Sequence, residues 1–143
     1  MTMLRANLTD TLNERNWDLA ALFEETKEIN LLIGRIGSGC PISLGEGFSG
    51  EVQQRRTQKQ QVNMLRTLVD KIRGVSAKHA KIRYGRGLEG WGYYIIDSLS
   101  TNGTFLGDKP VLNWTRLENG TELYFGAPVP HGYGPVVFSE EKV

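Results

Sequence analysis

Residues 93–111 read YYIIDSLSTNGTFLGDKPV, and this stretch carries the strongest local structural signal in the chain. Asn102-Gly103 separates two apolar runs. Asn-Gly is the dipeptide that two-residue hairpin turns prefer, because both residues tolerate a positive φ. The stretch therefore predicts strands over 92–97 and 104–106, joined by a tight turn. Whether that turn also holds a ligand depends on what the rest of the chain brings beside it.

Further short apolar runs on both sides of this turn predict an all-β protein. Seventeen glycines punctuate these runs, and Asn119-Gly120 repeats the turn signal. Many short strands with regular turn signals are typical of a sandwich or a barrel. The alternating segment 17–23 (WDLAALF) predicts one half-buried strand more. The other predicted strands cover 29–33, 42–44, 80–84, 122–125 and 136–138.

The composition is that of a soluble globular domain. The chain has 143 residues, of which 39% are hydrophobic and 23% charged, and its net charge is +1. This balance favours neither a nucleic acid nor an acidic membrane as the partner. The single cysteine, Cys40, excludes an internal disulfide and fits a reducing compartment. Without a secretory signal or an apolar run of roughly 18 residues, we expect an intracellular protein, nuclear or cytoplasmic, with no membrane partner.

Segment 51–73 (EVQQRRTQKQQVNMLRTLVDKIR) differs from the rest of the chain. It has no glycine, proline or aromatic residue, and it carries six basic and two acidic residues. Val62, Leu65, Val69 and Ile72 follow helical spacing, although a strand over 67–72 and a solvated loop in the first half stay open. A nucleic-acid patch is not expected, because no aromatic residue is interleaved for base stacking. We expect a domain over 17–139 with an insertion at 45–73 that could bind a further partner, a flexible N-terminal extension at 1–16 and a tail at 140–143.

No catalytic or metal-binding pattern is complete. Residues 44–52 (LGEGFSGEV) contain G-x-G-x-x-G and resemble the glycine-rich loop of protein kinases, but the lysine strand and the two catalytic aspartates of kinases have no counterpart. The βαβ unit of a dinucleotide site is missing as well. His79 and His131 lie far apart without cysteine or paired carboxylates nearby, which is poor ligand supply for a metal. The sequence predicts a protein that is not an enzyme and needs no metal or cofactor.

Three motifs stand in a characteristic order. Gly34-Arg35 follows an apolar strand, SAKH (residues 76–79) precedes the strand AKIRY, and STNGTF (residues 100–105) makes the central turn. This order, followed by LENGTELYFG at 117–126, resembles the forkhead-associated (FHA) domain family over roughly residues 18–138. The resemblance implies a β-sandwich of about eleven strands whose loops at one end bind phosphothreonine peptides.

The resemblance also implies a role for each motif residue. Arg35 would supply a guanidinium fork to the phosphate, Ser76 a hydroxyl donor and Thr101 a side-chain or backbone donor. Asn102 would hydrogen-bond the main chain of the peptide. The other positions in these motifs would contribute backbone (Ala77), positive potential (Lys78) or architecture (Gly34, His79 and Gly103).

Two functions from different classes follow. The first is a phosphothreonine-binding module for phosphorylation-dependent signalling, as part of a larger protein such as a checkpoint-type kinase. The second is a phospho-independent FHA-like scaffold or self-association domain. Gly74 lies where some relatives carry a side chain that selects the residue three places after the phosphothreonine, so a charge-based preference at that place is not expected.

Overall fold

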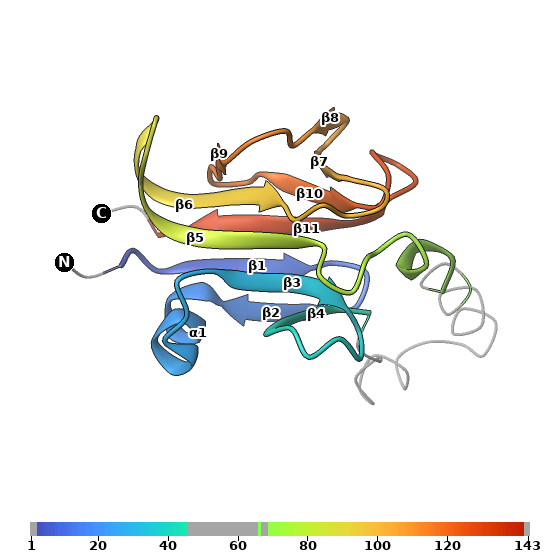
Figure 1. Cartoon of the computed structure of the whole chain (residues 1–143), viewed down its shortest axis with the longest axis horizontal. Coiled ribbons are helices and arrows are strands. Elements are labelled where there is room, and N and C mark those ends of the chain that lie inside the picture. Colours follow the sequence, from blue (N-terminus) through green and yellow to red (C-terminus); the bar gives the residue numbers. More distant parts are fainter. Residues whose placement is uncertain (1–2, 46–65, 67–68, 142–143) are drawn as a thin grey trace.

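The computed structural model describes residues 3–45, 66 and 69–141. Within these residues the chain folds into eleven strands, the helix α1 and a helical stretch at 69–72, and the order of elements is shown in Figure 1. The elements are β1 (Ala6–Asp10), β2 (Arg15–Asp18), α1 (Leu19–Thr26), β3 (Leu31–Arg35), β4 (Ile42–Leu44), β5 (Ala80–Gly87), β6 (Gly90–Asp97), β7 (Thr104–Leu106), β8 (Lys109–Pro110), β9 (Thr115–Arg116), β10 (Glu122–Phe125) and β11 (Tyr133–Glu140).

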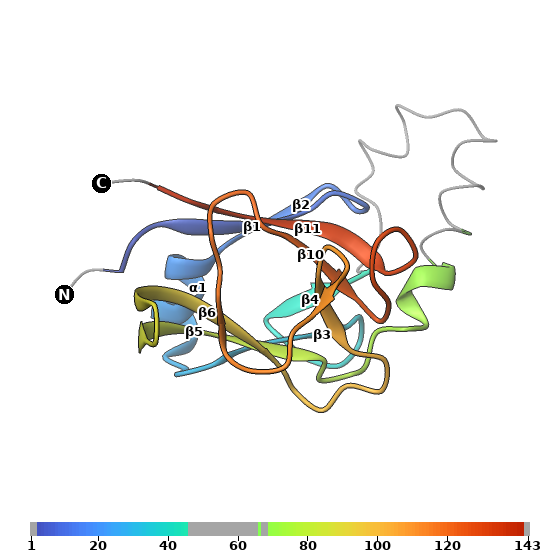
Figure 2. The ribbon, with the colours of Figure 1, turned by 90° about the horizontal axis from the view of Figure 1, so that it is seen from above.

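The strands form two sheets that pack face to face. One sheet has the order β2-β1-β11-β10-β7-β8 and the other β4-β3-β5-β6-β9. Figure 2 shows β1, β2 and β11 as one layer above β3, β5 and β6. All pairings are antiparallel except that of β3 with β4. The predicted FHA-type β-sandwich is confirmed.

Alternating side chains of the two sheets build the core. Ile33, Ile82 and Ile95 come from one sheet and Leu8 and Phe138 from the other, and all five are fully buried. Leu8, Ile82 and Phe138 have partly exposed neighbours along their strands, as a strand with one buried face requires. Each strand predicted between residues 29 and 138 has a counterpart in the structure.

The predicted strand over 17–23 is wrong beyond residue 18. Residues 19–26 form α1, which connects β2 of one sheet to β3 of the other. Asp18 caps this helix, because its Oδ1 accepts a hydrogen bond from Ala21 N at 3.1 Å. Leu19 and Phe23 are buried at helical spacing while Ala21 is exposed. The apolar residues of this segment fit the two-residue period of a strand as well as the period of a helix. The Asp18 cap favours the helix.

The predicted N-terminal extension is wrong as well. Residues 6–10 form β1, which lies between β2 and β11 in its sheet. Leu8 pairs with Phe138 in register, and Asp10 pairs with Val136. Likewise β11 continues to Glu140, so the sandwich begins before residue 17 and includes the first residue of the predicted tail.

Of the predicted insertion, the structure describes its last part only. Arg66 and residues 69–72 are helical, which agrees with the helical interpretation of the second half. Residues 46–65, 67 and 68, including most of the G-x-G-x-x-G match, lie outside the described residues. No helix in the described ranges is long and apolar enough to cross a membrane.

Candidate functional site

Three loops meet at the end of the sandwich that is remote from both termini (right in Figure 1). Arg35 ends β3, Ser76 lies in the loop before β5, and Thr101 lies in the β6–β7 loop. The backbone N–H of Arg35 donates to the Ser76 carbonyl at 3.1 Å. The backbone N–H of Thr101 donates to Ser76 Oγ at 3.1 Å. Ser76 therefore connects the other two loops directly.

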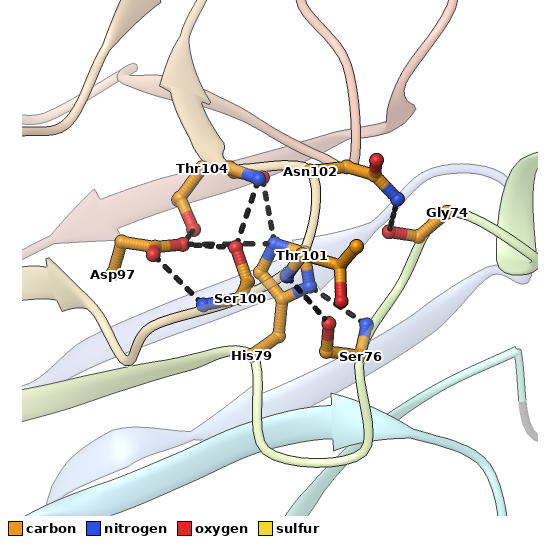
Figure 3. Close-up of polar contacts among 9 residues, drawn as sticks. Gly74, Ser76, His79, Asp97, Ser100, Thr101, Asn102 and Thr104 are labelled. Carbon is orange, nitrogen blue, oxygen red and sulfur yellow. Dashed lines mark hydrogen bonds and ion pairs between the residues drawn. The ribbon is translucent and has the colours of Figure 1, made fainter.

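This acceptor role fixes the orientation of the Ser76 hydroxyl. A hydroxyl has one proton and two lone pairs, and the bond from Thr101 N uses one lone pair. The proton stays available for an anion that approaches from solvent. Asn102 reaches the same loop from the other side, since its Nδ2 donates to the Gly74 carbonyl at 3.3 Å. Figure 3 shows both contacts across the gap between the loops.

His79 supports these loops from the interior of the sandwich. Its side chain is fully buried. Nδ1 accepts a hydrogen bond from the Ser76 backbone N–H at 2.9 Å, and Nε2 lies 2.7 Å from the Gly103 carbonyl oxygen. Because Nδ1 must accept and Nε2 must donate, the ring is the neutral tautomer with its proton on Nε2. Burial lowers the pKa of His79, against the opposing effects of the Gly103 carbonyl and Asp97.

The Gly103 carbonyl is shared between two elements. Besides His79 Nε2, it accepts the backbone N–H of Gly126 at 2.9 Å, at the end of β10. The His79 ring also meets the Phe125 ring edge to face, with 5.4 Å between ring centroids. Gly103 has φ +94°, a conformation that favours glycine. The central turn is thus held from β5 and from β10 at once.

A carboxylate that the sequence analysis did not single out fixes the β6–β7 loop. Asp97 Oδ1 accepts from Ser100 Oγ at 2.5 Å and from Thr104 Oγ1 at 2.7 Å, and its Oδ2 accepts from Ser100 N at 3.0 Å. Ser100 Oγ in turn accepts the Gly103 N–H at 2.8 Å. Figure 3 shows this network beside His79. An aspartate that precedes serines in a loop was the available signal, because such side chains bond to nearby backbone.

Gly34 allows the Ser76 loop to lie directly against β3. A Cβ at Gly34 would stand 1.9 Å from the Ala77 carbonyl oxygen and 2.8 Å from Cys40 Sγ. Cys40 Sγ donates to that same carbonyl at 3.3 Å. Ala77 thus meets β3 through its backbone. Gly34 is needed here for close approach, since no other residue fits.

The three loops enclose an open pocket of about 300 Å³. Of the predicted binding residues, Lys78 is exposed but is not part of the pocket wall. Arg73, which belongs to the predicted insertion, is part of the pocket wall. Within the described part of the chain, none of the wall residues is acidic. The wall consists of Arg35, Arg73, Gly74, Val75, Ser76, Ala77, Thr101 and Asn102.

The comparison with protein families agrees with this geometry. The family model described as FHA domain matches residues 55–126, just over half of the chain. This chain belongs to the FHA domain family. Family membership and the shared fold support a protein-interaction module of the phosphopeptide-binding type. No match was found among the curated proteins.

Solved structures of low sequence identity share the fold. Full-length yeast Pml1p aligns with a TM-score of 0.59 at 16% identity, over 97% of this chain and 82% of that chain. Mycobacterium tuberculosis Rv1747 FHA-1 aligns with a TM-score of 0.56 at 14% identity, over 98% of this chain and 99% of that chain. Mycobacterium tuberculosis EmbR, in complex with a low-affinity phosphopeptide, aligns with a TM-score of 0.55 at 18% identity, over 98% of this chain and 25% of that chain.

Proposed function

We propose that this FHA domain binds phosphothreonine peptides at the pocket between Arg35, Ser76 and Thr101, and that it acts as a phosphorylation-dependent interaction module without catalysis of its own. The observation that carries the proposal is the donor set of the pocket. It combines two guanidinium groups with an available hydroxyl proton, and none of the wall residues that the structure describes carries a carboxylate.

This donor set matches the chemistry of a phosphate ester. At neutral pH phosphothreonine carries a charge of about −1.5 to −2 and three acceptor oxygens. The planar fork of Arg35 can bind two of these oxygens, and the Ser76 hydroxyl can donate to the third. Ala77 is an exposed apolar wall residue that the γ-methyl group of threonine can contact. Asn102, at the rim, is placed to bond the main chain of the peptide.

The experiment is a titration with one peptide in three forms, carrying phosphothreonine, phosphoserine or threonine, chosen from an oriented phosphothreonine library. The phosphothreonine form should bind best and the unphosphorylated form should not bind measurably. Arg35→Ala should weaken binding at least about a hundredfold, since two charge-assisted hydrogen bonds of about 1.5–3 kcal/mol each are lost, and Arg35→Lys should recover only a part. Equal binding of all three forms would instead support the phospho-independent scaffold.

The cellular setting of this domain is predicted from its sequence and from one structural neighbour. The sequence analysis led us to expect an intracellular protein, nuclear or cytoplasmic, and a larger parent such as a checkpoint-type kinase. Yeast Pml1, which shares the fold, is a splicing factor that is integrated into the RES complex. We therefore propose a nuclear protein assembly as the first setting to test, by isolating partners from nuclear extract with and without phosphatase treatment. Partners that bind equally well after phosphatase treatment would count against phosphorylation-dependent binding.

A further inference from the structure

Arg73 reaches the pocket from an anchored segment. It follows the helical residues 69–72, and its backbone N–H donates to the Val69 carbonyl at 3.3 Å. The Nζ of Lys71 donates to the carbonyls of Pro130 and Gly132 at 2.8 and 3.1 Å. These bonds attach the segment to the loop between β10 and β11. Arg73 is thus held at the pocket by tertiary contacts on its own segment.

Close packing on both sides of Arg73 makes the attachment stronger. Ile72 lies against Gly45, where an added Cβ would stand 2.7 Å from Ile72 Cδ1. Gly74 lies against Gly126, where an added Cβ would stand 2.6 Å from the Gly74 carbonyl oxygen. Such approaches leave the backbone little freedom. The direction in which the chain presents Arg73 is therefore set by the sandwich.

The Arg73 guanidinium has no protein anion to bind among the residues that the structure describes. None of the ion pairs between described residues includes Arg73, and none of the described wall residues carries a carboxylate. Arg73 is exposed to solvent. An unpaired arginine in the wall of a ligand pocket is available for an anion of the ligand.

The two arginines come from different segments that meet at the pocket. Arg35 is bonded to Ser76 through its backbone, whereas Arg73 adjoins Gly74, whose carbonyl accepts the Asn102 amide. Gly74 and Val75 separate Arg73 from Ser76, and hydrogen bonds from Gly74 N to the Lys71 carbonyl at 3.2 Å and from Val75 N to the Ile72 carbonyl at 3.0 Å hold this stretch in a turn. When the Arg35 fork and the Ser76 hydroxyl bind the three oxygens of one phosphate group, Arg73 is left for another anion.

We propose that Arg73 binds a second anionic group of the peptide, next to the phosphothreonine on the side held by Asn102. The proposal rests on the proposed function of the same pocket. The anion is a carboxylate of Asp or Glu or a second phosphate, because the guanidinium fork fits both. The domain is therefore selective for phosphothreonine in an acidic or doubly phosphorylated context, and it achieves this without a side chain at Gly74.

The test is a titration of the whole chain with matched phosphothreonine peptides at low ionic strength, about 50 mM, where exposed charges are weakly screened. One peptide has neutral flanks. In the others a single Asp, or a single phosphoserine, is moved through the four positions on each side. An acidic residue at one position should raise affinity about threefold to fivefold, the range of an exposed ion pair, and phosphoserine there should raise it at least as much.

Variants assign the gain to Arg73. Arg73→Gln should abolish this gain, so that the variant binds acidic and neutral peptides with equal affinity, whereas Arg73→Lys should keep part of the gain. Arg86→Gln removes the same charge from an exposed site at the far end of β5 and should keep the whole gain. Circular dichroism before each titration checks that the variants fold.

Three results would overturn the proposal in distinguishable ways. A uniform loss with every peptide in Arg73→Gln would mean that Arg73 binds the phosphothreonine phosphate itself. A preference for acidic peptides that survives in Arg73→Gln would place the second anion elsewhere. If the wild-type chain binds none of the phosphothreonine peptides, neutral or acidic, the proposed function itself fails, and this inference fails with it.

Discussion

Asn102 bonds two loops of the site in the free protein. Its Nδ2 donates to the Gly74 carbonyl at 3.3 Å while the side chain is exposed at the pocket rim. A residue that only formed the turn would tolerate Asp, because Asp-Gly suits a tight turn as well as Asn-Gly does. A residue whose amide donates would not, because an ionised carboxylate only accepts.

We therefore expect Asn102→Asp to weaken phosphothreonine-peptide binding at least about tenfold, since the loss of the amide donor and the repulsion of the new carboxylate by the phosphate act together. The free energy of unfolding should fall by no more than about 1 kcal/mol, since the lost bond is exposed. Calorimetric titration and chemical denaturation measure the two effects. Unchanged affinity in Asn102→Asp would reduce Asn102 to a turn residue.

His79 makes the stability of the site dependent on pH. The unfolded chain protonates this imidazole near pH 6.5, whereas burial lowers its pKa in the folded protein. Between these two pKa values the unfolded state binds more protons, so stability falls as the pH falls. The contribution is fully present above about pH 6.5 and decreases below it, by at most about 1.4 kcal/mol per pH unit.

The measurement is the free energy of unfolding between about pH 7.5 and about pH 5. In wild-type protein it should decline toward the acid side, and in His79→Gln this decline should be smaller. His131→Gln, which changes the exposed second histidine, should behave like the wild type. Burial raises the pKa of Asp10, which gives the opposite slope at the acid end, but this effect is common to all three proteins. A wild-type profile that is flat below about pH 6.5 would contradict the buried neutral ring.

Motif residues and pocket residues overlap only in part, for a physical reason. The resemblance of the motifs around Arg35, Ser76 and Asn102 to the FHA domain family implied that their loops lie together, and the turn and strand signals that frame these motifs are local. Arg73 carried no such signal. Its place in the wall depends on contacts of Lys71 and Ile72 with residues that are distant in the sequence. Such contacts cannot be predicted from a single sequence.

At the scale of elements, the contact between β3 and the Ser76 loop supports the site. Gly34→Ala would place a methyl group 1.9 Å from the Ala77 carbonyl oxygen, so the loop or the strand must move. We expect a loss of stability of about 1–3 kcal/mol, the range for overpacking a tight contact, and a loss of most peptide affinity, because the Arg35–Ser76 backbone bond is displaced.

Gly85→Ala is the matched control for this prediction. Gly85 also lies in the second sheet, in β5, but an added Cβ there meets nothing within 4 Å. Affinity and stability of Gly85→Ala should stay close to those of the wild type. If Gly34→Ala retains both as well, the two backbones are not packed as tightly as the structure shows.

Most strands could be predicted because each carries its own alternation and its own turn residues. The segment from Trp17 to Phe23 could not, because its apolar residues satisfy the strand period and the helix period together. The Asp18 cap and the burial of Leu19 and Phe23 selected the helix. The two-residue strands β8 and β9 are too short to have a period at all.

At the scale of the whole molecule, the N-terminal strand lies beside the C-terminal strand in one sheet. β1 pairs with β11, from Ala6–Glu140 to Asp10–Val136. The buried carboxylate of Asp10 accepts the Tyr133 hydroxyl at 2.5 Å, and this hydroxyl accepts the Gly45 N–H at 3.1 Å. The pairing could not be predicted, because the five residues of β1 are mostly polar or small and their partners lie more than a hundred residues away.

This pairing predicts that the domain does not fold without its first 16 residues. Leu8 is fully buried, and Leu8→Ala should cost about 2–5 kcal/mol by the usual cost of a core truncation. Deleting residues 1–16 removes Leu8, Ala6 and the Asp10 bonds together and exposes the edge of β11 to other chains. With total stabilities of about 5–15 kcal/mol, the chain 17–143 should lack a cooperative unfolding transition and should aggregate.

Asn7→Ala, on the outward face of the same strand, should change stability by no more than about 0.5 kcal/mol. Thermal unfolding followed by circular dichroism separates these cases, and a chain 17–143 that melts cooperatively and binds the phosphothreonine peptide would show that β1 is dispensable.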